Sequence, residues 1–237
     1  MKILKKLIPN KLKSKLNQLL IDYCDGYSIK SYSQEGEDMV LRRIFENIDK
    51  GFYIDVGAHH PKRFSNTYYF YKNGWRGINI DARPGSMVDF NKTRPRDINI
   101  EAAIASERRE LTYYMFNEPA VNSFDKELSY SDSRRNYKMI GEKIIFSQRL
   151  DELLPLYLPV GMKINFMTID VEGLDLEVLE SNDWQLLRPE YLLVECLQAS
   201  LDDIKQNRVY KFLKTNDYTL FAKAVNTVIF KDTITDR

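Results

Sequence analysis

The sequence predicts an α/β domain with an open, largely parallel sheet and helices on both faces. Short strands rich in Val and Ile alternate with helical segments along the chain, which is typical of parallel α/β folds. The strands lack clean apolar and polar alternation, as expected for a sheet that is buried on both sides. The 237 residues are enough for one large domain with a substantial core.

Composition and charge argue against several classes of protein. A net charge of +1 indicates no general attraction to nucleic acid or anionic lipid. Only two cysteines occur, Cys24 and Cys196, and they lack metal-ligand spacing, so we expect no disulfide framework and a cytoplasmic protein. No apolar run approaches the roughly 18 residues that a membrane-spanning helix needs.

Residues 1–30 predict a basic N-terminal helical arm, separate from the domain of residues 31–237. Six lysines precede the first acid, Asp22: Lys2, Lys5, Lys6, Lys11, Lys13 and Lys15. After the break at Pro9, four leucines recur at helical spacing: Leu12, Leu16, Leu19 and Leu20. The arm is either docked on its own domain or partly ordered, or it rests on an anionic membrane surface as a peripheral contact.

The first half of the domain begins with an amphipathic helix and continues with strands. We expect helices at 33–48 and 83–94 and strands at 51–58, 76–82, 97–105 and 111–116. The stretch 65–75 is expected to be helical or irregular.

Residues 117–147, hereafter the insertion, are polar and show no clean periodicity, so they predict a loop or insertion rather than a domain. Its basic and aromatic side chains form either a solvated loop or a lid over the site. These are Tyr130, Arg134, Arg135 and Tyr137. After the insertion we expect helices at 149–158, 174–184 and 201–216 and strands at 164–173 and 188–197. Residues 218–231 predict a closing strand or hairpin.

The stretch FYIDVGAHHPKRFSNT, residues 52–67, begins like a glycine-rich nucleotide-binding turn and then lacks the later glycines. In parallel α/β sheets ligands bind beyond the carboxyl ends of the strands, where Asp55 and Gly57 lie. Gly57 allows a tight turn with no Cβ facing a ligand. A dinucleotide is disfavoured, because its pyrophosphate needs the missing glycines. A ligand with one adenosine, a sulfonium and an amino-acid tail needs only the first turn.

Asp81 ends the next expected strand, about 24 residues beyond Gly57. An acid there can accept hydrogen bonds from both hydroxyls of a ribose. The alternative is that Asp55 and Asp81 are turn-forming acids of an ordinary α/β protein. The only two histidines, His59 and His60, are adjacent and so poorly placed to chelate one ion. We expect them to line the loop, with a direct role at cofactor or substrate as the alternative.

Four segments in fixed order resemble the FkbM family of S-adenosylmethionine-dependent methyltransferases. They are SQEGEDMVL, GFYIDVGAHHPKRFSNTYYFYKNGWRGINIDARP, RPRDINIEAAI and IDVEGLDLEVLES, and the resemblance covers roughly residues 33–195. It implies a class I methyltransferase fold, which is Rossmann-like, with a mostly parallel seven-stranded sheet. It also implies S-adenosylmethionine as cofactor and O-methylation of a sugar or polyketide hydroxyl. The form GAHHPKRFSNT is similar to a branch found near bacterial surface-glycan genes, which implies a sugar acceptor.

The resemblance assigns cofactor contacts to particular residues. The first cofactor motif would be Asp55, Gly57 and Ala58; Asp81 would hold the ribose; and Ala102 and Ala103 would lie near the adenine. Where the family often has Glu-Pro, this chain has Asp81 and Ala82, and an aspartate can still bind a diol.

Three more side chains are predicted to contact the cofactor. Gln34 and Asp38 precede the first strand and could reach over the cofactor, although an N-terminal cap explains them almost as well. Asn66 lies in the segment Ser-Asn-Thr, which either contacts the methionine tail or caps the following helix.

Candidates for the reacting end come from two later strand ends. An alcohol proton must leave during methyl transfer, so a base or an acidifying metal assists. Asp170 and Glu172 follow one buried strand, and Glu195 ends the next, so the three acids should converge. They would act as a general base, bind Mg²⁺, or cap the next helix. His59 is a further catalytic candidate.

The sequence therefore predicts an S-adenosylmethionine-dependent O-methyltransferase that acts on a sugar hydroxyl of a surface glycan, glycolipid or sugar nucleotide. One alternative is a nicotinamide-dependent oxidoreductase, which the missing glycines disfavour. Another is an inactive methyltransferase-like partner in glycan assembly. Nucleic acid is a poor candidate partner, because no basic stripe with interleaved aromatics occurs beyond the arm.

Overall fold

The computed structural model describes residues 9–23, 27–131, 134–197 and 200–234. The chain divides into two compact units, Met1–Ser31 and Tyr32–Arg237. The first unit contains helix α1 (Asn10–Tyr23), in the segment that the sequence predicts as a helical arm. No helix in the described ranges is long and apolar enough to cross a membrane.

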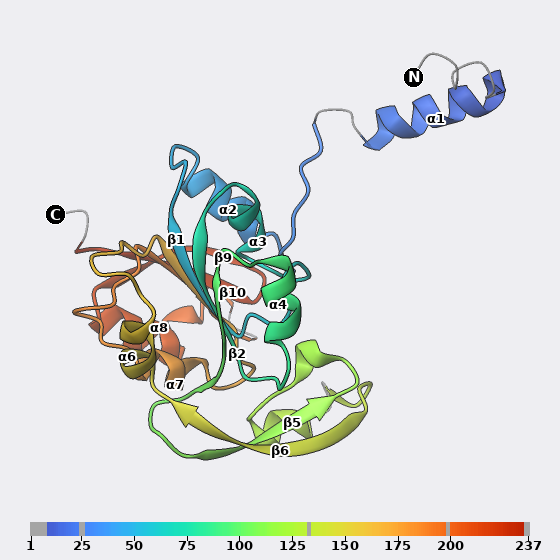
Figure 1. Cartoon of the computed structure of the whole chain (residues 1–237). Coiled ribbons are helices and arrows are strands. Elements are labelled where there is room, and N and C mark those ends of the chain that lie inside the picture. The colour runs from blue at the N-terminus through green and yellow to red at the C-terminus, as the bar shows by residue number, and fades with distance from the viewer. Residues whose placement is uncertain (1–8, 24–26, 132–133, 198–199, 235–237) are drawn as a thin grey trace. The chain divides into compact units, whose positions relative to one another are not determined.

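The described part of the second unit is built on a seven-stranded sheet of order β3-β2-β1-β7-β8-β10-β9 (Figure 1). Its strands are β1 (Phe52–Val56), β2 (Arg76–Asp81), β3 (Ile98–Glu101), β7 (Phe166–Ile169), β8 (Tyr191–Glu195), β9 (Tyr218–Ala224) and β10 (Thr227–Asp232). Neighbours from β3 to β8 are parallel, and β10 runs antiparallel to β8 and β9. Chain order reverses between β1 and β7, which is the point where open α/β sheets bind ligands.

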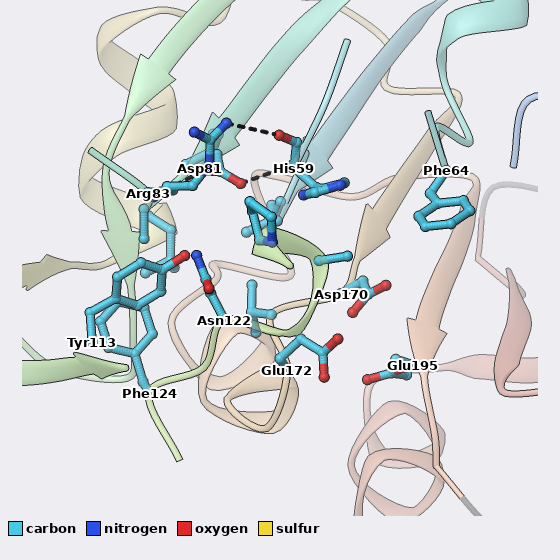
Figure 2. A pocket seen from close by; sticks show the side chains of 18 of the residues that line it. His59, Phe64, Asp81, Arg83, Tyr113, Asn122, Phe124, Asp170, Glu172 and Glu195 are labelled. Atoms are coloured by element: carbon cyan, nitrogen blue, oxygen red, sulfur yellow. Dashed lines mark hydrogen bonds between the residues drawn. The ribbon is translucent and has the colours of Figure 1, made fainter. Parts of the chain in front are cut away.

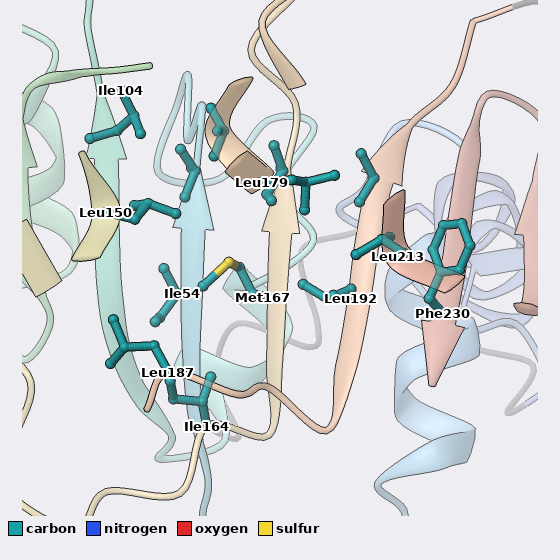
Figure 3. Close-up of a cluster of buried hydrophobic side chains, with 14 of the residues drawn as sticks. Ile54, Ile104, Leu150, Ile164, Met167, Leu179, Leu187, Leu192, Leu213 and Phe230 are labelled. Carbon is teal, nitrogen blue, oxygen red and sulfur yellow. The ribbon is translucent and has the colours of Figure 1, made fainter. Parts of the chain in front are cut away.

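One face of the sheet is covered by three helices from the second half of the chain (Figure 3). They are α6 (Leu150–Leu153), α7 (Asp175–Glu180) and α8 (Arg208–Thr215). Leu179 and Leu213 from these helices join Ile54 and Met167 of the strands in one fully buried cluster. Apolar burial of this kind is the main force that holds helices on a sheet.

The opposite face carries an aromatic cluster. Here α2 (Glu37–Ile44) and α3 (Tyr68–Lys72) pack against the sheet, and the rings of Phe70 and Phe166 lie 5.0 Å apart. The successive residues Tyr53 and Ile54 of β1 belong to opposite clusters. Both sides of the strand are therefore buried, which explains why its sequence does not alternate.

The insertion is not only a loop, and the prediction is wrong for its last part. Strand β5 (Glu110–Phe116) pairs antiparallel with β6 (Met139–Gln148), whose end pairs with β4 (Ala103–Ile104) in a separate three-stranded sheet. Strand β6 has no buried apolar face by which its sequence could be recognised as a strand, because Ile140, Ile144 and Phe146 are exposed. Its partner strand lies more than twenty residues away along the chain, so the pairing has no local signal.

Two other expected elements are divided. The predicted strand 97–105 becomes β3 and β4, which belong to different sheets. The predicted helix 201–216 becomes the short helix η5 (Ile204–Gln206) followed by α8, because Asn207 caps α8 by accepting a hydrogen bond from the Val209 amide. Other helices in the described residues are α4 (Met87–Thr93), α5 (Lys126–Ser129), η2 (Pro119–Val121) and η4 (Leu154–Leu156).

Candidate active site

The carboxyl ends of four parallel strands meet at one cleft. In the strand register, Val56 pairs with Ile80 and Ile169, and Ile169 pairs with Val194. The residues that follow Ile80, Ile169 and Val194 therefore emerge at the same edge: they are Asp81, Asp170 and Glu195. This cleft is open to solvent, and residues at all four strand ends line it.

Gly57 is required at the first turn for a different reason than the sequence indicated. Its φ of 86° lies in the left-handed region, and a Cβ built on it would lie 1.7 Å from the carbonyl oxygen of Asp170. Its amide donates to the Ile80 carbonyl at 2.9 Å. The turn after β1 therefore packs between the ends of β2 and β7. Gly57 makes its close approach to protein backbone and not to a ligand.

Asp81 lies buried at one end of the cleft, as Figure 2 shows. Its Oδ2 accepts a hydrogen bond from the His59 amide and its Oδ1 from the Arg83 amide, both at 2.9 Å. Burial raises the pKa of Asp81, and the two amides partly offset that rise. Each carboxylate oxygen keeps a further lone pair, so the pair can still accept two ribose hydroxyls.

His59 lines the cleft with a positive φ of 51°. Its Nε2 is buried and has no hydrogen-bond partner in the described structure. Burial, with the nearby charge of Arg63, lowers the pKa of His59 to about 4, so the ring is neutral at physiological pH. An imidazole with so low a pKa is a weak proton acceptor, so His59 suits a hydrogen bond to a hydroxyl better than the role of base. His60 instead accepts two loop amides at its Nδ1, from Lys62 and Arg63.

The three predicted acids gather away from Asp81 in the cleft, and Figure 2 shows their carboxylates turned toward a common region. The side chain of Asp170 is exposed to the solvent of the cleft, but many protein atoms lie close around its carboxyl group. This burial and the charge of Glu172 raise the pKa of Asp170 well above its usual value. Burial and the charge of Asp170 likewise raise the pKa of Glu195. The cluster cannot be fully ionised at low cost.

Glu172 differs from the other two acids because it has a cationic partner. Arg134, a buried residue of the insertion, forms an ion pair with its carboxylate. Burial raises the pKa of Glu172, and the Arg134 charge acts against that rise. Ser123 donates to the backbone carbonyl of Glu172, so two insertion residues hold this turn. Asp175, the first residue of α7, accepts the amides of Val171 and Gly173 and so fixes the turn that precedes this helix.

The magnesium alternative gains no support from the donor geometry. Within the residues that the structure describes, no group of three or more His, Cys, Asp or Glu side chains is arranged to hold a metal ion. One carboxylate oxygen of Glu172, Oε2, already accepts a hydrogen bond from the guanidinium of Arg134. A cation is therefore already supplied by the protein.

The other predicted cofactor residues fall into two groups. Those that line the cleft are Gln34, Gly57, Ala82 and Ala102. Those outside its lining are Asp38, Asp55, Ala58 and Asn66.

The residues outside the lining have protein partners instead. Asp38 accepts hydrogen bonds at the start of α2 and pairs with Arg42 at 2.7 Å. Ala58 packs under the loop with α4. The amide nitrogen of Asn66 donates to Thr168 at 3.0 Å. For Asp38 and Ala58 the structure thus corrects the expected direct contact, because their side chains are used in the fold.

Asp55 belongs to a buried polar network beneath the cofactor loop. Thr67 donates to the Asp55 carboxylate at 2.7 Å, and fully buried Arg94 donates to Thr67 at 3.0 Å. Arg94 also bonds Asp97 at 2.8 Å and the Tyr53 hydroxyl at 2.8 Å. Burial raises the pKa of Asp55 to about 6, against the opposing charge of Arg94. Asp55 therefore supports the loop from below and does not face the ligand.

The sequence missed the contribution of the insertion to the cleft. Asn122 and Phe124 of the insertion, together with Tyr113 of the preceding strand β5, form one wall (Figure 2). Arg134 was noted as a lid candidate, but its pairing with Glu172 was not foreseen. Only the concentration of aromatic and basic residues in an otherwise polar segment pointed to these residues.

Fold and site together define a class of protein. A sheet of this strand order, with one antiparallel strand near its edge and an acid after the second strand, is the class I methyltransferase fold. The cleft fits S-adenosylmethionine: Asp81 has lone pairs for a ribose, and apolar Ile80, Ala102 and Ile104 line the neighbouring space. The buried Nε2 of His59, which has no partner in the described structure, adds a polar contact.

Residues 55–220 match the family described as the methyltransferase FkbM domain, and the chain belongs to this family. The prediction of family and fold is confirmed, and S-adenosylmethionine binding is expected. None of the curated proteins matches this chain in sequence.

Several solved structures are similar to the chain at low identity. A proposed RNA methyltransferase from Pyrococcus horikoshii has a TM-score of 0.45 and 8% identity, with 84% of each chain covered. Precorrin-6y C5,15-methyltransferase from Geobacter metallireducens GS-15 has a TM-score of 0.43 and 14% identity, over 86% of this chain and 90% of that one. An O-methyltransferase from Bacillus cereus in complex with SAH has a TM-score of 0.42 and 11% identity, over 94% and 91%. These likenesses carry no information on substrate.

Proposed function

We propose that the protein transfers a methyl group from S-adenosylmethionine to a saccharide hydroxyl, in a surface glycan, glycolipid or sugar nucleotide. The carboxylate cluster of Asp170, Glu172 and Glu195 at the cleft is the observation that carries this proposal. Carboxylates accept hydrogen bonds from sugar hydroxyls, and the ring of Phe64, which also lines the cleft and is 40% exposed, offers an apolar surface for the C–H face of a sugar ring.

The bound cofactor supplies an activated methyl group on its sulfonium. The protein then has to orient the acceptor hydroxyl and take up its proton. Asp170 is assigned as the base, because it is open to the cleft and its raised pKa makes its carboxylate a stronger proton acceptor than an ordinary aspartate. Glu172 is the weaker candidate, since its ion pair with Arg134 stabilises the charged form. Glu195 and neutral His59 are assigned to hydrogen bonds with the acceptor.

Calorimetric titration with S-adenosylmethionine and a transfer assay on a panel of cell-surface sugars and sugar nucleotides test this function together. We expect saturable cofactor binding and methylation of a saccharide, and the same rate with and without EDTA. Binding of cofactor with no transfer to any saccharide would overturn the acceptor class. Failure to bind it would overturn the function as a whole, and a parallel titration with NADH would then test the oxidoreductase alternative.

Replacing Asp81 with Ala should weaken S-adenosylmethionine binding by roughly ten- to a hundredfold, because hydrogen bonds to a charged acceptor are worth more than neutral ones. The dissociation constant from calorimetry measures the effect. Asp89, an exposed residue of α4, provides the control as Asp89→Ala, which should leave the affinity unchanged. Equal affinities of the two variants would contradict the ribose assignment of Asp81.

A further inference from the structure

Helix α1 carries an apolar stripe that the described residues of its own unit leave uncovered. Its four leucines, Leu12, Leu16, Leu19 and Leu20, are 50–56% exposed. At about 100° per residue, they fall within an arc of roughly 100° on the helix surface. Ser14, Asn17 and Gln18 occupy the opposite side. The helix is therefore amphipathic, with one continuous leucine face.

Charge is distributed around that stripe in a specific way. On the same helical geometry, Lys13 and Lys15 lie on either side of the leucine arc. The sequence holds six lysines and no acid before Asp22. This segment is strongly basic, although the whole chain has a net charge of only +1. A leucine face bordered by lysines matches a surface that is apolar inside and anionic outside.

We propose that α1 binds the surface of an anionic membrane, with its leucines among the acyl chains and its lysines against the acidic headgroups. Apolar burial and electrostatic attraction together give stable interfacial binding where one alone is marginal. A second copy of the chain fits less well as the occupant, because the lysines bordering each stripe would face one another. The helix also spans only 14 residues, which is short for a coiled coil. This inference does not depend on the acceptor proposed above.

Vesicle flotation of the full-length protein tests the proposal directly. The two probes are vesicles of phosphatidylcholine alone and vesicles with equal amounts of phosphatidylcholine and phosphatidylglycerol. We expect binding to the anionic vesicles at low ionic strength and a smaller bound fraction at high ionic strength, because salt screens the lysines. Absence of binding to the anionic vesicles, or equal binding to both kinds, would overturn the proposal.

Two pairs of substitutions separate the apolar and electrostatic contributions. Leu16→Ser with Leu19→Ser should weaken vesicle binding at least about tenfold through lost apolar burial. Leu186→Ser is the apolar control, since Leu186 is 79% exposed on the other unit. It should bind like the unchanged protein, and equal loss in the control would contradict a specific role of α1.

Lys13→Gln with Lys15→Gln should weaken binding to the anionic vesicles on the order of tenfold or more. The charge-matched control is Lys92→Gln with Lys211→Gln, both exposed on the other unit. Light scattering of the protein without lipid completes the test. We expect the same molar mass for the leucine variant and the unchanged protein; a lower mass in the variant would assign the leucine face to a second copy and overturn the membrane proposal.

Discussion

Replacing Asp170 with Asn is expected to lower the turnover number by roughly 10²- to 10⁴-fold, the usual contribution of a general base. Asparagine has a similar shape but cannot take up the acceptor proton. Affinity for S-adenosylmethionine should change little, because Asp81 lies elsewhere in the cleft. Turnover and cofactor affinity are measured separately, by transfer assay and calorimetry. A normal turnover number in this variant would remove Asp170 from the chemistry.

The pH dependence of turnover provides a second readout for the same residue. A base acts only when it is deprotonated, so the rate should fall as the pH drops through the raised pKa of Asp170. This acid limb should lie at higher pH than an ordinary aspartate would give. Asp202→Asn, at an exposed position, is the control. It should leave both the turnover number and the pH at which turnover falls unchanged.

The same substitution should stabilise the fold at alkaline pH, which separates lost chemistry from misfolding. A carboxyl whose pKa is raised by folding binds its proton more tightly in the folded state than in the unfolded chain. Its ionisation therefore destabilises the protein as the pH rises above its ordinary value, near 4. Asparagine does not ionise, so the melting temperature of Asp170→Asn should exceed that of the unchanged protein by more at pH 8 than at pH 5. An equal difference at both pH values would contradict the raised pKa.

Replacing Arg94 with Met should lower the free energy of unfolding by about 3–5 kcal/mol, the usual result of removing one partner from a buried ion pair. Arg94 and Asp97 are both fully buried, and Asp97 would lose its cationic partner. Burial alone would lower the pKa of Arg94, but neighbouring Tyr53 and Asp97 outweigh it and raise that pKa. Urea unfolding at pH 7 measures the change.

Arg43→Met is a matched control for this prediction. Arg43 pairs with Glu46 across the same sequence separation, but its side chain is 82% exposed. Exposed pairs contribute about 0–1 kcal/mol, so the unfolding curve of this variant should move little. A similar loss in the two variants would mean that burial of the Arg94 network contributes nothing beyond an ordinary surface pair.

Much of the site could be predicted because parallel strands place their carboxyl ends at one edge. Recognising the strands that end at Asp81, just before Asp170 and at Glu195 was sufficient to bring these acids to the cleft. What strand patterns do not show is which side a terminal residue faces. Asp55 lies on the side of Arg94, so it was predicted to contact the cofactor but supports the loop instead.

The contribution of the insertion could not be predicted because it depends on long-range pairing. Strand β6 is formed by its hydrogen bonds with β5, and its own residues leave apolar side chains exposed. The ion pair between Arg134 and Glu172 joins residues 38 positions apart. Neither feature has a periodic signal, so a polar segment was interpreted as a loop.

The close approach between Gly57 and the carbonyl of Asp170 ties the turn after β1 to the end of β7. A Cβ on Gly57 would collide with this carbonyl, so we expect any substitution there to displace both the loop that carries His59 and the backbone that carries Asp170. Tyr113 of the cleft wall lies on β5 in a separate sheet, so we expect substitutions there to leave this backbone crossing unchanged.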